Sequence, residues 1–128
     1  MSWYVGLFEA SGVLASEFVK RGHRAICVDL AAEPGERDGV VYVCEDVRDW
    51  IPPRQIVEDG VVFLAAFPPC DHLAVSGARW FQGKGLGALA QSVELFERAA
   101  FWAEYFDAPY FIENPVSTIS TYWRKPDH

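Results

Sequence analysis

A run of six apolar residues that leads into two prolines constrains this chain more than any other feature. Val61–Ala66 is apolar at every position, which is typical of a central parallel strand covered on both faces rather than an alternating edge strand. Pro68 and Pro69 cannot donate ladder hydrogen bonds, so the strand has to end before them. Cys70 therefore follows a stiff turn at the carboxyl end of a strand, which is the edge where open α/β sheets bind their ligands.

The composition predicts one globular domain over residues 1–128. The chain is 51% hydrophobic, which is enough for one well-filled core. No apolar run approaches the ~20 residues of a membrane-spanning helix, and no basic region precedes the first apolar run, so we expect a cytoplasmic protein. Three cysteines without CxxC spacing argue against a disulfide framework and a structural zinc site. With a net charge of −7, any contact with nucleic acid needs a local basic patch or a partner.

The rest of the chain alternates between strand and helix patterns. Further strands are predicted at residues 3–8, 24–29, 39–44 and 109–113, and helices at 13–21 and 88–106, with a turn or two of helix near 56–57. The polar segment 31–38 contains Pro34 and Gly35 and is expected to be a surface loop. This order predicts an α/β fold in which a doubly wound, mostly parallel sheet has helices on both faces.

Acidic residues follow three successive predicted strands. Glu9 comes after the first strand, Asp29 ends the second, and Glu45 and Asp46 follow the third. Because the carboxyl ends of parallel strands meet at one edge, we expect these residues to share one site. The turn up to Gly12 resembles the nucleoside- or phosphate-binding turns of α/β proteins, and Asp29 stands where such sheets bind ribose hydroxyls. An ordinary strand-to-helix connection and a solvated aspartate at a strand end would explain the same residues without a ligand.

The segment 73–87 leaves two interpretations open. It contains four glycines, two cations and two aromatic residues, and it shows no periodicity of its own. The cations Arg79 and Lys84 would suit contact with phosphates, and the aromatic residues Trp80 and Phe81 between them would suit base stacking. The alternative is a hydrophobic flap that packs on the sheet.

Five short motifs give the chain a family resemblance. They are, in order, Leu7–Gly12, Val28–Asp29, Glu45–Asp46, Phe67–Cys70 and Ile112–Asn114. In these motifs the chain resembles the catalytic core of the cytosine-5 DNA methyltransferases, which use S-adenosylmethionine, and it looks most like the short versions encoded by bacteriophages. The resemblance covers nearly the whole chain. It implies a Rossmann-like methyltransferase core that acts in the cytoplasm of a bacterial or phage-infected cell.

The resemblance also implies a reaction and a role for each motif. The family transfers a methyl group from S-adenosylmethionine to carbon 5 of a cytosine in DNA while a cysteine is covalently bound to carbon 6. Cys70 would be that cysteine, Glu113 would protonate or hydrogen-bond ring nitrogen 3, and Asn114 would hold that carboxyl group or the exocyclic amine. Arg79 would lower the pKa of the thiol. The cofactor-binding residues that the resemblance implies are Phe8, Glu9, Ala10, Ser11, Gly12, Asp29, Leu30, Asp46, Val47 and Pro68.

The chain departs from the family in two respects that matter below. Glu9 and Ala10 stand where the family more often has small residues and an extra glycine. Apart from Arg124 and Lys125 in place of its later basic motif, the family's basic motif, final antiparallel strands and target-recognition domain have no counterpart in this sequence, so we expect a core truncated after the fifth strand. Such a core would act on DNA by itself, or a second copy or another subunit would complete the edge of its sheet.

Other interpretations of the same residues remain open. The chain could be a non-catalytic module that binds S-adenosylmethionine or a nucleotide, or an interaction protein that needs a partner. Cys70 could be a buried packing residue, or with His72 it could begin a metal site, although no second cluster has ligand spacing. We therefore predict no resident metal.

Overall fold

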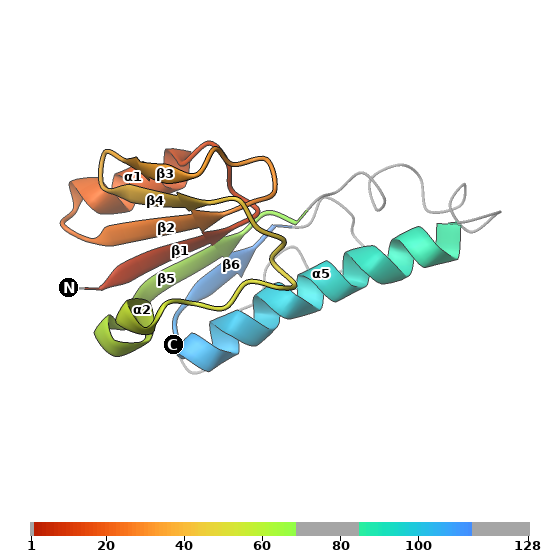
Figure 1. Cartoon of the computed structure of the whole chain (residues 1–128). Helices are drawn as coiled ribbons and strands as arrows, with labels where there is room; N and C mark the ends of the chain where they lie inside the picture. Colours follow the sequence, from red (N-terminus) through yellow and green to blue (C-terminus); the bar gives the residue numbers. More distant parts are fainter. Residues whose placement is uncertain (1, 69–84, 114–128) are drawn as a thin grey trace.

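The described residues of the chain form a six-stranded sheet with helices on both faces (Figure 1). A computed structural model describes residues 2–68 and 85–113, with side chains described for 2–68 and 93–113. The strands are β1 (Trp3–Leu7), β2 (Arg24–Val28), β3 (Gly35–Arg37), β4 (Val40–Val43), β5 (Val61–Ala66) and β6 (Tyr110–Ile112). The helices are α1 (Val13–Lys20), α2 (Arg54–Asp59) and α5 (Gly85–Phe106).

The strands lie in the order β3-β4-β2-β1-β5-β6, and every neighbouring pair except β3 and β4 is parallel. β1 lies near the centre, where Leu7 is in register with Val28 of β2 and Ala66 of β5. Parallel neighbours need crossover connections. α1 lies in the connection between the neighbours β1 and β2, and α5 lies in the connection between the neighbours β5 and β6, whereas α2 lies between β4 and β5, which are not neighbours. The predicted α/β class and mostly parallel sheet are confirmed.

The prediction that residues 31–38 form only a surface loop was wrong. β3 lies inside this segment and pairs antiparallel with β4, so that Arg37 is opposite Val40. Asp38 and Gly39 make the two-residue turn with φ of 54° and 84°, as a type I′ hairpin requires. All three residues of β3 are exposed, so no apolar alternation marks the strand. The Asp-Gly dipeptide was the signal that could have revealed it.

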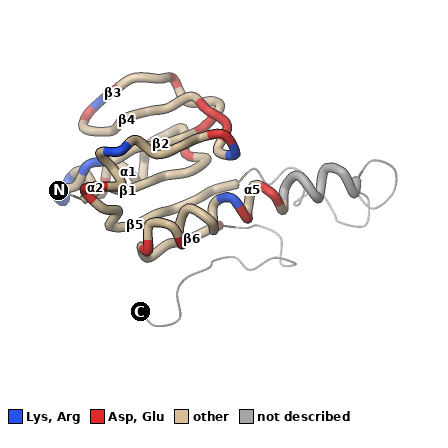
Figure 2. The backbone as a smooth tube through the Cα atoms, turned by 60° about the horizontal axis from the view of Figure 1, so that its bottom comes forward, with Lys and Arg blue, Asp and Glu red and all other residues tan. Residues whose placement is uncertain are grey.

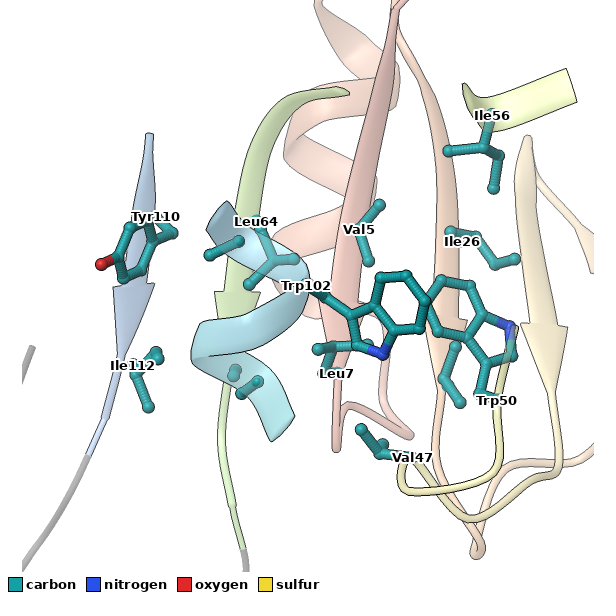
Figure 3. Packing of buried hydrophobic residues seen from close by; sticks show 14 of the residues in the cluster. Val5, Leu7, Ile26, Val47, Trp50, Ile56, Leu64, Trp102, Tyr110 and Ile112 are labelled. Carbon is teal, nitrogen blue, oxygen red and sulfur yellow. The ribbon is translucent and has the colours of Figure 1, made fainter. Parts of the chain in front are cut away.

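Two hydrophobic clusters lie on opposite faces of the sheet, because successive side chains of β1 point to opposite sides. On one face, Phe18 of α1 stacks on Tyr4 with ring centroids 4.6 Å apart. On the other face, Trp102 of α5 meets the ring of Trp50 edge-on, with centroids 5.7 Å apart (Figure 3). The cluster around Trp102 also contains Ile56 of α2, so α2 and α5 cover the same face of the sheet.

The predicted helices are present with small shifts at their ends. α5 begins at Gly85 instead of residue 88 and ends at Phe106, as predicted, and its buried residues Phe96, Ala99 and Ala103 recur at helical spacing. Within the described residues, no helix combines the length and the apolar character needed to cross a membrane.

Candidate ligand site at the carboxyl edge of the sheet

The strand order reverses next to β1, and a pocket lies at that point. β1 leads through α1 to β2 on one side, whereas β5, which comes later in the chain, lies on its other side. In open α/β sheets, ligands bind outside the carboxyl ends of the strands where the order reverses. The pocket has a volume of about 390 Å³ and is lined by Phe8, Glu9, Ala10, Ser11, Val13, Leu14 and Phe67. Four of the predicted cofactor residues, 8–11, therefore line one pocket.

The turn from β1 into α1 has a tightly constrained backbone. Phe8 and Gly12 have positive φ angles of 60° and 74°. The Phe8 N–H donates to the Val28 carbonyl at 2.7 Å, which ties the turn to β2. Gly12 is the N-cap residue of α1, and a Cβ atom there would collide with the hydroxyl group of Tyr42. The turn is thus fixed by contacts with both β2 and β4.

Glu9 is buried at the base of this turn, with 5% of its surface exposed. The Tyr4 hydroxyl donates to Oε1 at 2.6 Å, and the Ala15 N–H donates to Oε2 at 3.2 Å. Ala15 lies in the first turn of α1, where free amides and the helix dipole favour an anion. Burial, and then the neighbouring Glu9 carboxylate, raise the pKa of Tyr4 far above its usual value, so its phenol keeps the proton that it donates.

Asp29 and Leu30 follow β2 at the same edge. The Asp29 N–H donates to the Val43 carbonyl at 3.0 Å, which holds this position against β4. Its Oδ1 accepts the Ala31 N–H at 2.6 Å, an Asx turn, whereas Oδ2 makes no hydrogen bond within the described part of the chain. Leu30 is 68% exposed. Two consecutive residues thus offer groups that a ligand could contact: Oδ2 of Asp29 and the apolar side chain of Leu30.

Asp46 and Val47 follow β4, and neither side chain is as accessible as Leu30. Arg48 donates to Asp46 through Nε at 3.1 and 3.2 Å and through Nη2 at 2.7 Å, and it also reaches Glu94 of α5 at 3.5 Å. Hydrogen bonds from Arg48 hold the pKa of Asp46 below its usual value. Val47 is 1% exposed and belongs to the cluster under α5 (Figure 3). A ligand amine would have to compete with Arg48 for the Asp46 carboxylate.

Replacing Arg48 with alanine is expected to remove a pH-dependent part of the stability. The pKa of Asp46 is lowered in the folded protein, so its stabilising interaction is present above the ordinary aspartate pKa of about 3.9 and is lost as pH falls through the folded value. The difference in free energy of unfolding between wild type and Arg48→Ala should therefore be largest near neutral pH and shrink below about pH 4. Urea unfolding at a series of pH values measures it. Arg54→Ala is the control, because this exposed arginine is 3.7 Å from exposed Glu58. A difference that is constant with pH would contradict the prediction.

The ends of β5 and β6 bring the remaining described residues to this edge. Phe67 donates its N–H to the Leu7 carbonyl at 3.0 Å, and Pro68 follows it. Glu113 directly follows β6, is exposed, and donates its N–H to the Ala66 carbonyl at 3.0 Å. Cys70, Arg79 and Asn114 lie outside the described residues. The residues after β1, β2, β4, β5 and β6 thus share one edge, and Figure 2 shows acidic positions in loops at this end of the sheet.

Sequence analysis did not identify Val13, Leu14 or Phe67 as pocket residues. Val13 and Leu14 were assigned to the helix by their apolar spacing alone. Val13 is 70% exposed at the first position of α1. A large apolar residue directly after the glycine of the turn was the signal that could have placed Val13 in the pocket wall. Phe67 was recognised as part of a motif, but its contact with the pocket depends on the pairing of β5 with β1.

The fold and this edge define an α/β protein with a candidate ligand site at the carboxyl ends of its parallel strands. Comparisons with models of protein families, with curated proteins and with solved structures give no match for this chain. Among the side chains that the structure describes, no three His, Cys, Asp or Glu residues are grouped so that they could hold a metal ion.

Proposed function

We propose that this protein transfers a methyl group from S-adenosylmethionine to carbon 5 of cytosine in DNA. The observation that carries the proposal is the order of its parallel strands, with the pocket at the point of reversal. Without the short antiparallel β3, the order β4-β2-β1-β5-β6 is third, second, first, fourth and fifth in chain sequence. This is the beginning of the strand order of doubly wound dinucleotide-binding sheets, which supports a Rossmann-like core.

The described residues offer suitable groups for the two ends of S-adenosylmethionine. Asp29 would accept hydrogen bonds from ribose hydroxyls through its free Oδ2, and the exposed side chain of Leu30 would cover the adenine ring. The pocket between the β1–α1 turn and Phe67 would hold the methionine end. The cofactor supplies an electrophilic methyl group. If the Asp46 carboxylate also binds the adenine amine, its hydrogen bonds with Arg48 would have to break.

The proposed chemistry gives Cys70 and Glu113 complementary tasks. The Cys70 thiolate adds to carbon 6 of cytosine, and the electron pair displaced from the ring double bond makes carbon 5 nucleophilic enough to accept the methyl group. The methyl transfer releases S-adenosylhomocysteine. A water molecule then takes the proton from carbon 5, which restores the ring double bond and expels the Cys70 thiolate. Glu113, in its protonated form, donates a hydrogen bond or its proton to ring nitrogen 3 and so favours the addition. If the DNA is duplex, the target base has to be flipped out of the helix.

Replacing Cys70 with serine is expected to abolish methyl transfer. The assay is incorporation of label from S-adenosylmethionine into cytosine-containing DNA, and loss of a covalent nucleophile should lower the rate at least about a thousandfold. Cys44→Ser is the matched control, because this exposed thiol donates to the Leu30 carbonyl at 3.3 Å and should be replaceable with less than about a twofold effect.

A trapping experiment identifies the nucleophile independently of turnover. A DNA oligonucleotide containing 5-fluorocytosine cannot lose the atom at carbon 5 as a proton, so the covalent adduct should accumulate and be found on Cys70 by mass spectrometry. Absence of both the adduct and label incorporation, over a range of salt concentrations, would reject the proposed function.

A non-catalytic binding role is the second proposal, and one observation favours it. Phe101 and Tyr105 on α5 are 51% and 53% exposed, and their rings stack with centroids 6.4 Å apart. Adjacent exposed aromatic residues are typical of surfaces that contact another protein. Calorimetry separates the two roles: the absence of any binding of S-adenosylmethionine, together with no transfer to DNA, would favour a protein-interaction role over catalysis.

A further inference from the structure

Among the described residues that line the pocket, Glu9 is the one charged side chain, and no described cation pairs with it. The ion pairs of the described residues involve other carboxylates, including those of Glu17, Asp46 and Glu58. Burying a carboxylate is unfavourable unless hydrogen bonds or an opposite charge compensate for the lost water. Glu9 is therefore a buried anion beside an open pocket whose positive partner is missing from the described part of the chain.

The position of this anion is fixed by the surrounding residues. Both carboxylate oxygens accept a hydrogen bond, one from the Tyr4 hydroxyl and one from the Ala15 N–H. Each oxygen of the Glu9 carboxyl group therefore has one partner within the protein. Gly6 provides the space, because a Cβ atom there would collide with Oε1. The two donors are neutral groups, so they hold the carboxylate in place without neutralising it.

The other pocket walls suit a poorly hydrated cation. Phe8 and Phe67 supply aromatic surface, Val13 and Leu14 supply aliphatic surface, and Ser11 supplies a hydroxyl group. Aromatic rings attract cations that have little bound water, and a carboxylate adds direct charge complementarity. No other residue of this lining is ionisable.

We propose that Glu9 makes this pocket selective for a positively charged group of the ligand, the sulfonium or the ammonium group of S-adenosylmethionine. The inference rests on the proposed function, because it identifies which part of the cofactor the pocket holds. It assigns a role to the residue by which this chain departs from the resembled family, which more often has a small residue at this position.

The test is calorimetric titration of the full chain with three ligands. S-adenosylmethionine carries the sulfonium and ammonium groups, S-adenosylhomocysteine carries only the ammonium group, and 5′-methylthioadenosine carries neither. Glu9→Gln should weaken binding of S-adenosylmethionine by about tenfold or more, while methylthioadenosine changes by less than about twofold. If adenosylhomocysteine also weakens, the pocket holds the ammonium group. If adenosylhomocysteine does not weaken, the pocket holds the sulfonium.

Two further variants separate charge from structure. Tyr4→Phe removes one hydrogen-bond donor but leaves the carboxylate, so it should keep or increase the wild-type preference for S-adenosylmethionine over methylthioadenosine. Glu58→Gln removes an exposed charge on α2, and all three affinities should stay within about twofold. Thermal unfolding shows whether Glu9→Gln is folded. If Glu9→Gln is not folded, Tyr4→Phe still tests the proposal. Loss of the preference for S-adenosylmethionine over methylthioadenosine in Tyr4→Phe would overturn it.

The outcomes distinguish this inference from the proposed function. If Glu9→Gln weakens all three ligands equally, Glu9 only shapes the turn, and the charge selectivity is rejected while methyl transfer stands. If wild type binds none of the three ligands, the cofactor site itself is rejected, and the inference is rejected with it.

Discussion

Replacing Gly12 with alanine is expected to lower the free energy of unfolding by about 3 kcal/mol. Gly12 has a φ of 74°, a conformation that costs an alanine about 1 kcal/mol or more. The new methyl group would also collide with the Tyr42 hydroxyl, and overpacking of this kind costs about 1–3 kcal/mol. Urea denaturation monitored by circular dichroism measures the sum of the two effects.

Two control variants separate the backbone cost from the collision. Gly22 has a φ of 91° with nothing within 4 Å of its would-be Cβ atom, so Gly22→Ala should cost only about 1 kcal/mol. Tyr42→Phe removes the hydroxyl group that collides, so Gly12→Ala made in this background should recover about 1–2 kcal/mol of its loss. Equal losses for Gly12→Ala and Gly22→Ala would show that the collision is relieved elsewhere.

This glycine matters for the site as well as for stability. Gly12 ends the turn whose residues 8–11 line the pocket, and Tyr42 supports it from β4. A displaced turn would move this whole wall of the pocket, Glu9 included, whereas Glu9→Gln changes only a charge. In a folded Gly12→Ala variant, ligand affinity is thus expected to fall for charged and uncharged ligands alike, unlike in Glu9→Gln.

Most of the fold could be predicted because its signals are local. Val61–Ala66 is a central strand, as its uniform apolar character indicates, and it pairs with β1 and β6 on its two sides. Helix α5 was predicted from apolar spacing, and Phe96 and Ala103 of that pattern lie in the core on the sheet. β3 was missed because an exposed three-residue strand contributes no hydrophobic pattern, and only its turn dipeptide signals it.

The candidate site was predictable in its place but only partly in its chemistry. Parallel topology brings the residues after β1, β2 and β4 to one edge, as expected. The partners of those residues depend on tertiary contacts that spacing does not reveal. Glu9 follows a strand like any solvated acid, yet it is buried because Gly6 leaves room and Ala15 offers a free amide. Arg48 was not predicted to take part in the site, yet it donates to Asp46 and also to Glu94, which lies 46 residues after Arg48 in the chain.

Replacing Trp102 with alanine is expected to destabilise the fold by about 3–5 kcal/mol, the cost of removing a large aromatic side chain from a core. Trp102 is 6% exposed and contacts Trp50 where α5 packs on the sheet (Figure 3). Phe101→Ala, at the preceding position of the same helix, should cost less than about 1 kcal/mol because half of that side chain is already exposed. Guanidinium unfolding compares the two, and similar losses would mean that α5 is not held by this buried face. Because α5 leads into β6, and Glu113 follows β6, the same packing sets where a catalytic carboxylate would stand beside the end of β5.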